Sequence, residues 1–146
     1  MTRASPLTDL QLTYFVGYAM WNYLVAPFFL LRPDFSVTEL APHTENGEET
    51  AWRVLEITWP DDIPAHNRVQ RFYFDAQTCM LKRFDYCADV FQAHASHYCY
   101  DPKTFGGIVV PTVRRVVRRD PESGAVFLNG QTSFLLDYVD VVVRDD

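Results

Sequence analysis

The chain has 146 residues, of which 48% are hydrophobic and 22% are charged, and this size and composition predict a single folded domain. Its formal net charge of -6 disfavours binding to nucleic acids or anionic membranes, because such binders present excess positive charge. The 3 cysteines show no CxxC spacing, which argues against a disulfide scaffold and favours reduced thiols.

The N-terminal residues lack a cationic stretch followed by an apolar core, so no signal peptide is predicted and a cytoplasmic location is expected. Residues 12–31 carry no charge and reach the length of a membrane span. However, Asn22, Pro27 and several Tyr and Trp residues interrupt this segment, and aromatic residues of these types prefer the membrane interfaces. A buried helix is therefore favoured over a membrane span.

A helix is predicted over about residues 7–26, because large apolar side chains recur at steps of three and four. Thr8 or Ser5 is expected to cap its start, and Pro27 ends or kinks it because the proline ring removes an amide donor. The opposite face is apolar too. A helix that is apolar on all sides needs other elements to enclose it, so we expect this helix to be buried.

After residue 33 the hydrophobic pattern changes to a period of two, which predicts strands. The predicted strands cover about residues 35–40, 51–59, 68–75, 80–87, 94–100, 107–119 and 133–143. Asn46–Gly47 and Asn129–Gly130 are turn signals, and Pro111 marks an edge or a bulge. We expect an α+β, mainly β fold: a curved antiparallel sheet or partial β-barrel around the N-terminal helix, with a cavity at one mouth.

Several segments carry a resemblance to known proteins: Gly17–Leu24, Phe72–Asp75, Arg83–Tyr86, His97–Tyr98, Gly107–Thr112 and Arg114–Val116. Over most of residues 14–143 the chain resembles a family of bacterial hypothetical proteins. More distantly, its order of hairpin, Gly-Ile-x-x-Pro strand and closing strand is similar to the half-barrel of lipoprotein-sorting (LolA-like) domains, whose concave face takes up lipid. The resemblance implies a half-barrel without the strands that longer relatives place before the helix, and a homodimer is one way to cover its open edge.

Three polar residues are the predicted catalytic group. Pairing of residues 80–87 with 94–100 would bring Asp85 against His97 or His94, and Tyr98 lies on the same short segment. Histidine exchanges protons near neutral pH when a carboxylate or hydroxyl orients its ring. These residues are therefore candidates for an acid–base site, and the alternative is that they tie the sheet to its loops.

No metal or cofactor is expected. His94, His97, Cys99 and Asp101 offer ligand types within a short span, but strand alternation divides them between two faces. Neither a Gly-rich phosphate loop nor a Gly-x-Ser-x-Gly motif is present.

Arg114 belongs to a cluster of basic residues near the end of a predicted strand. It is a candidate to hold a carboxylate or phosphate of a ligand, since arginine binds such groups through two parallel hydrogen bonds. The alternative is a solvated strand whose arginines pair with Asp137 and Asp140.

The aromatic residues, 15% of the chain, are more than a small core packs easily, and this excess predicts a ligand cavity lined by rings. The predicted substrate-binding residues are Trp21, Trp52, Phe72, Tyr86, His94 and Arg114. We expect the partner to be a hydrophobic small molecule, polyketide-like or isoprenoid-like, that a cofactor-free cyclase or isomerase converts. The alternatives are a non-catalytic carrier or sensor of a lipophilic ligand, and a dimeric structural module.

Overall fold

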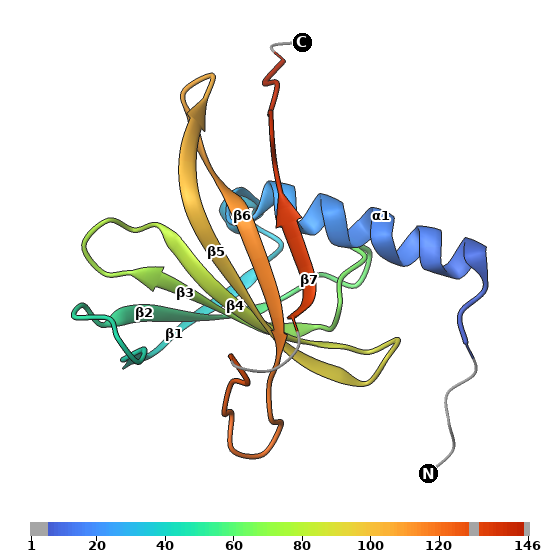
Figure 1. The fold of residues 1–146 in the computed structure, drawn as a ribbon, viewed down its shortest axis with the longest axis horizontal. Coiled ribbons are helices and arrows are strands. Elements are labelled where there is room, and N and C mark those ends of the chain that lie inside the picture. Colours follow the sequence, from blue (N-terminus) through green and yellow to red (C-terminus); the bar gives the residue numbers. More distant parts are fainter. Residues whose placement is uncertain (1–5, 129–131, 145–146) are drawn as a thin grey trace.

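One helix precedes seven strands, and the strands pair in chain order to form an open antiparallel sheet (Figure 1). The computed structural model describes residues 6–128 and 132–144, so the predicted turn at Asn129–Gly130 lies outside the described residues. The elements are α1 (Asp9–Val25), the 3-10 helix η1 (Phe28–Leu31), β1 (Ser36–His43), β2 (Trp52–Thr58), β3 (Val69–Asp75), β4 (Leu81–Ala88), β5 (Ala93–Phe105), β6 (Ile108–Arg118) and β7 (Thr132–Asp137). The predicted mainly β fold with an N-terminal helix is confirmed, and the sheet is not closed into a barrel.

Both ends of α1 follow from its sequence. The amide of Gln11 donates to Thr8 Oγ1 at 3.3 Å, and the amide of Thr8 donates to Gln11 Oε1 at 2.9 Å, which forms a capping box. Thr8 is thus the cap, and the alternative, Ser5, lies outside the described residues. The helix ends at Val25. Ala26 precedes Pro27, and a residue directly before a proline disfavours helical geometry.

Helix α1 buries only one side, which corrects the expectation that other elements enclose it. Its buried residues are Phe15, Ala19, Asn22 and Tyr23. The N-terminal half extends past β7 in Figure 1, and Leu10 there is 79% exposed. A single open sheet covers one side of a helix, and no second layer of the described chain lies over the other side.

The main core lies between α1, η1 and one face of the sheet. The strand register places Phe72 opposite Phe84 and Phe84 opposite His97, and these three rings stack in a row across β3, β4 and β5. Phe29 is the buried residue of η1, and its ring packs 4.5 Å from that of Trp59. Offset and edge-to-face ring pairs add to the hydrophobic stabilisation of such a core.

A second, smaller core lies on the opposite face of the sheet, which we call the outer face. It contains Trp52, Val54, Tyr73, Tyr98 and Val117. These residues alternate along their strands with residues of the main core, as the period-two pattern requires. The aromatic excess of the sequence is thus divided between two faces.

The hairpin of β5 and β6 is longer than predicted and rises above the rest of the sheet (Figure 1). Its tip is the pair Gly106–Gly107, with φ of 53° and 83°, a conformation that glycine adopts without steric cost. Pro102 and Pro111 face each other below the tip. Two prolines are tolerated there because no third strand needs their missing amide donors.

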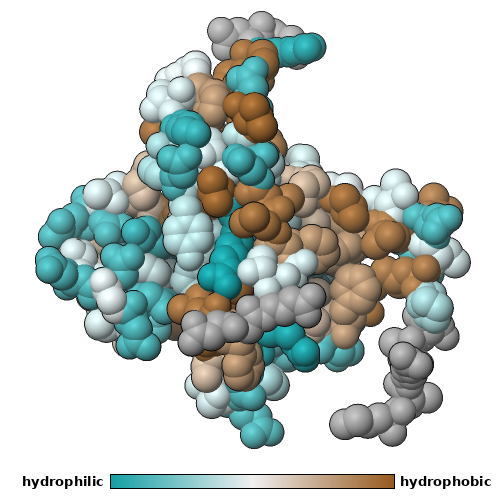
Figure 2. Space-filling model, viewed as in Figure 1, coloured by the Kyte–Doolittle hydropathy of each residue, from teal (hydrophilic) through white to brown (hydrophobic). Residues whose placement is uncertain are grey.

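Strand β7 ends at Asp137, whereas the sequence predicts a strand up to residue 143. One further hydrogen bond, from the amide of Tyr138 to the carbonyl of Thr112, holds the start of the segment that follows. Hydrophobic residues gather over α1 and beside the upper part of β6 and β7, whereas the end of the molecule near β1 and β2 is mostly hydrophilic (Figure 2).

Candidate functional site

Strand alternation separates the predicted catalytic residues. The predicted pairing of the segments is confirmed, with Asp85 opposite Ser96 and Phe84 opposite His97. Asp85 and Tyr98 therefore lie on the outer face, while His97 points toward α1 and packs 4.4 Å from the ring of Tyr23. The expected pair of Asp85 and His97 does not form, because adjacent positions on paired strands face opposite sides.

On the outer face, Asp85 is the centre of a buried polar network. Its carboxylate accepts hydrogen bonds from Arg83 Nε at 2.8 Å and Nη2 at 2.7 Å, from Tyr73 Oη at 2.9 Å and from Ser96 Oγ at 2.7 Å. Arg83 also donates to Glu45 Oε2 at 2.7 Å. Burial alone raises the pKa of Asp85, but the hydrogen bonds and charge of Arg83 outweigh it, so the pKa lies below its usual value. Asp85 is thus a fixed anion with its acceptor sites filled.

A polar pocket of about 510 Å³ lies over this network. His94, a predicted ligand-binding residue, lines it together with Asp85 and Tyr86. Arg71 and Arg119, which the sequence did not predict for this site, line it as well. Glu56 Oε2 lies 3.1 Å from Arg71 Nε, whereas Arg119 Nε has Asp85 Oδ2 nearby at 3.7 Å but no hydrogen-bond partner. These internal pairs leave little unbalanced charge for a ligand.

On the side of the sheet that faces α1, three buried side chains share hydrogen bonds. Tyr23 Oη lies 2.8 Å from His66 Nε2 and 3.0 Å from Tyr86 Oη, and the rings of His66 and Tyr86 stack 4.1 Å apart. Burial lowers the pKa of His66 to about 4, so its imidazole is neutral at physiological pH. Tyr86, predicted to bind substrate, belongs to this interior cluster.

Arg114 and His97 are also fully buried on this side. Arg114 Nη1 contacts Cys99 Sγ at 3.4 Å, and the guanidinium lies 5.6 Å from the centre of the Tyr138 ring. Burial, followed by the charge of Arg114, lowers the pKa of His97 well below its usual value. The alternative of a solvated Arg114 that pairs with Asp137 and Asp140 is therefore wrong: the side chain lies inside the protein.

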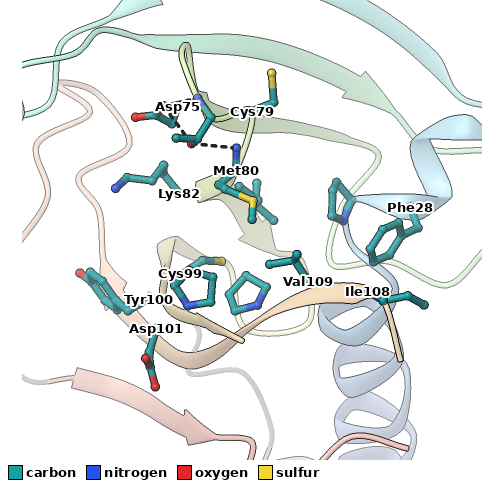
Figure 3. A pocket seen from close by; sticks show the side chains of 16 residues that line it. Phe28, Asp75, Cys79, Met80, Lys82, Cys99, Tyr100, Asp101, Ile108 and Val109 are labelled. Atoms are coloured by element: carbon teal, nitrogen blue, oxygen red, sulfur yellow. Dashed lines mark hydrogen bonds between the residues drawn. The ribbon is translucent and has the colours of Figure 1, made fainter. Parts of the chain in front are cut away.

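An apolar cleft lies next to this interior group. It has a volume of about 630 Å³ and is bounded by the end of α1, the turn between β3 and β4, and the hairpin of β5 and β6 (Figure 3). Most of its lining is apolar: Pro27, Phe28, Met80, Leu81, Cys99, Pro102, Ile108, Val109 and Pro111. Cys99 is common to the cleft and to the contacts of Arg114, so the two features adjoin.

None of the predicted site residues is among the residues that line the apolar cleft. Phe72 is part of the core, Trp52 lies on the outer face, and Trp21 is 45% exposed on α1. The aromatic rings fill the two cores by packing against one another, while aliphatic, proline and sulfur-containing side chains dominate the cleft. The sequence signal that was missed is Pro102, which pairs with Pro111 and with it marks the part of the hairpin that leaves the sheet.

No protein-family model matches the chain, and neither a curated protein nor a solved structure does so. Within residues 6–128 and 132–144, no group of three His, Cys, Asp or Glu side chains is arranged to hold a metal ion. Over the same residues, no helix has the length and apolar character needed to cross a membrane.

Proposed function

We propose that this protein binds an apolar small molecule in the cleft between α1, the β3–β4 turn and the β5–β6 hairpin, as a carrier or sensor. The observation that carries the proposal is the cleft itself, whose volume is about 630 Å³ and whose lining is mainly apolar. Small-molecule sites are typically clefts of about 300–1,000 Å³ with apolar walls and a few polar groups.

The geometry favours binding over the cyclase or isomerase chemistry that the sequence suggests. General acid–base catalysis needs a proton donor within hydrogen-bond distance of the substrate, or one water away. Asp85 lies on the opposite face and is fixed as an anion, and burial raises the pKa of Tyr98 well above its usual value. A carrier or sensor needs only the apolar walls of the cleft.

Binding is tested with N-phenyl-1-naphthylamine, a neutral apolar fluorophore whose emission rises in an apolar environment. The protein is expected to enhance its fluorescence, and dodecanol is expected to displace it. Val109 lines the cleft and is partly exposed, so Val109→Glu places an unpaired charge in the site without disturbing the core. This variant is expected to weaken binding at least about tenfold.

The matched control is Val37→Glu, since Val37 is similarly exposed but lies on β1, outside the cleft. It should bind the probe as the unmodified protein does. Absence of probe binding, or equal weakening by both substitutions, would overturn the proposal.

A further inference from the structure

The guanidinium of Arg114 is a buried positive charge with no anion beside it. Its side chain is 0% exposed, and its Nε and Nη2 atoms have no hydrogen-bond partner. The ion pairs formed within residues 6–128 and 132–144 do not include it. Arginine stays protonated in proteins, and an unpaired buried ion costs several kcal/mol. The unliganded fold therefore carries a charge that a suitable anion would neutralise.

Further unsatisfied polar atoms lie around Arg114. Both ring nitrogens of His97 and the hydroxyl of Tyr138 are buried without a hydrogen-bond partner. His97 and Tyr138 each lie close enough to Arg114 for its charge to influence their ionisation. Buried polar groups are nearly always hydrogen-bonded, so several unpartnered atoms around one cation favour a ligand that carries acceptor oxygens.

The apolar cleft ends one side chain away from this group. Cys99 lines the cleft, and its sulfur atom is the atom that contacts Arg114 Nη1. Arg114, His97 and Tyr138 do not themselves line the cleft, so a ligand in it reaches Arg114 only where the side chain of Cys99 turns aside. Figure 3 shows Cys99 at the base of the space, with Met80 and Val109 farther along its walls.

We propose that the natural ligand is a carboxylic acid with an apolar body, whose carboxylate pairs with Arg114 while its body occupies the cleft. This inference rests on the proposed function and names its ligand class. Tyr138 and His97 provide further polar atoms for the carboxylate oxygens. A carboxylate carries one negative charge and balances one guanidinium, whereas a phosphate monoester carries about −1.5 to −2 at neutral pH and would leave excess charge buried.

The first test compares dodecanoate with dodecanol, which has a similar chain but no charge, as competitors of N-phenyl-1-naphthylamine. Dodecanoate is expected to bind at least about tenfold more tightly, because hydrogen bonds between two charged groups are stronger than those of a neutral hydroxyl. Arg114→Gln is expected to abolish this difference, because the neutral glutamine amide does not pair with a carboxylate as the guanidinium does. The control is Arg115→Gln, since Arg115 is the next residue on β6 but binds Thr132 and the carbonyl of Leu128 instead.

A second measurement needs no ligand and covers the case in which Arg114→Gln folds poorly. Arg114→Met replaces the unpaired cation by an apolar chain of similar length, so the unliganded variant should have a higher melting temperature than the unmodified protein. A lower melting temperature would show that Arg114 stabilises the empty fold and would contradict the inference.

The outcomes separate the two proposals. If the fluorophore binds but dodecanoate and dodecanol compete equally well, the apolar cleft is a binding site and the carboxylate inference is wrong. If neither the fluorophore nor either competitor binds, the proposed function itself fails.

Discussion

Two arginine side chains of this protein are buried, and they differ in whether carboxylates neutralise their charge. Arg83 is held by two carboxylates, with Asp85 Oδ2 at 2.7 Å and Glu45 Oε2 at 2.7 Å. Arg114, two strands away, has a sulfur atom and an aromatic ring as its neighbours. The ion pairs of Arg83 fix local geometry, whereas the guanidinium of Arg114 carries the desolvation cost of a buried charge without a carboxylate to offset it.

The first prediction concerns the satisfied pair. Asp85→Asn removes the charge that neutralises Arg83 while it keeps the size of the side chain, so it is expected to destabilise the fold by about 3–5 kcal/mol. Urea unfolding, followed by far-ultraviolet circular dichroism, measures the loss. The matched control is Glu39→Gln, because Glu39 pairs with Arg53 at 2.8 Å on the exposed surface. That change should cost less than about 1 kcal/mol. Equal losses in both variants would contradict the assignment of Asp85 as the centre of the network.

At the scale of elements, α1 is attached to the sheet by a small number of buried side chains. Tyr23 is the polar anchor, since its hydroxyl joins His66 of the loop before β3 to Tyr86 of β4. Asn22 adds a second link, because its Nδ2 donates to the carbonyl of Pro64 at 3.1 Å. These contacts set the position of the helix across the sheet, which apolar residues on all faces of the helix do not specify.

The second prediction tests this anchor. Tyr23→Phe keeps the ring and removes the hydroxyl, which leaves buried polar atoms of His66 and Tyr86 without that partner. The free energy of unfolding is expected to fall by about 1–3 kcal/mol. Tyr14→Phe is the control, because Tyr14 lies on the same helix and is 62% exposed, and it should change stability by less than about 0.5 kcal/mol. The anchoring role is wrong if unfolding experiments show no difference between the two variants.

At the scale of the whole molecule, the fold leaves much apolar surface uncovered. Leu10 and Leu31 on the N-terminal elements and Leu135 on the last strand are exposed, and β1 and β7 have open edges. Such surfaces usually mark interaction sites, and open strand edges offer unpaired backbone groups. The homodimer expected from the sequence stays a prediction.

The third prediction is the pH dependence of the stability of the whole protein. The pKa of His66 is about 4 in the folded protein and about 6.5 in the unfolded chain, so the unfolded chain binds more protons between these values. The free energy of unfolding should therefore decrease as the pH falls from 6.5 to about 4, by up to about 3 kcal/mol from His66 alone. His97 acts in the same direction, because burial lowers its pKa too.

Urea unfolding at several pH values across this range measures the effect. His66→Gln should reduce the loss at low pH, since glutamine does not titrate. Asp85 contributes only at lower pH, because its lowered pKa keeps it ionised until the pH falls below its usual value. Equal stability of the unmodified protein at both ends of the range would refute the prediction.

Local patterns in the sequence were sufficient for most of the elements and for the pairing of residues 80–87 with 94–100, but not for the order of the whole sheet. The period-two segments, the turn residues and the capping residue Thr8 each act through a few neighbouring residues, so the strands and the start of α1 could be predicted. Neighbouring residues of a strand face opposite sides of the sheet. If Asp85 pairs with Ser96, then Asp85 and His97 must face opposite sides. Only the exact register of β4 and β5 was missing.

Burial and proximity were decided by the tertiary structure. The sequence determined that Arg114 lies on a strand, but its enclosure depends on Cys99 and Tyr138, which come from different parts of the chain. Likewise, the cleft forms where the end of α1 meets two hairpins. The physical reason is that secondary structure depends on interactions between near neighbours, whereas a binding site depends on distances between residues that only the folded chain brings together.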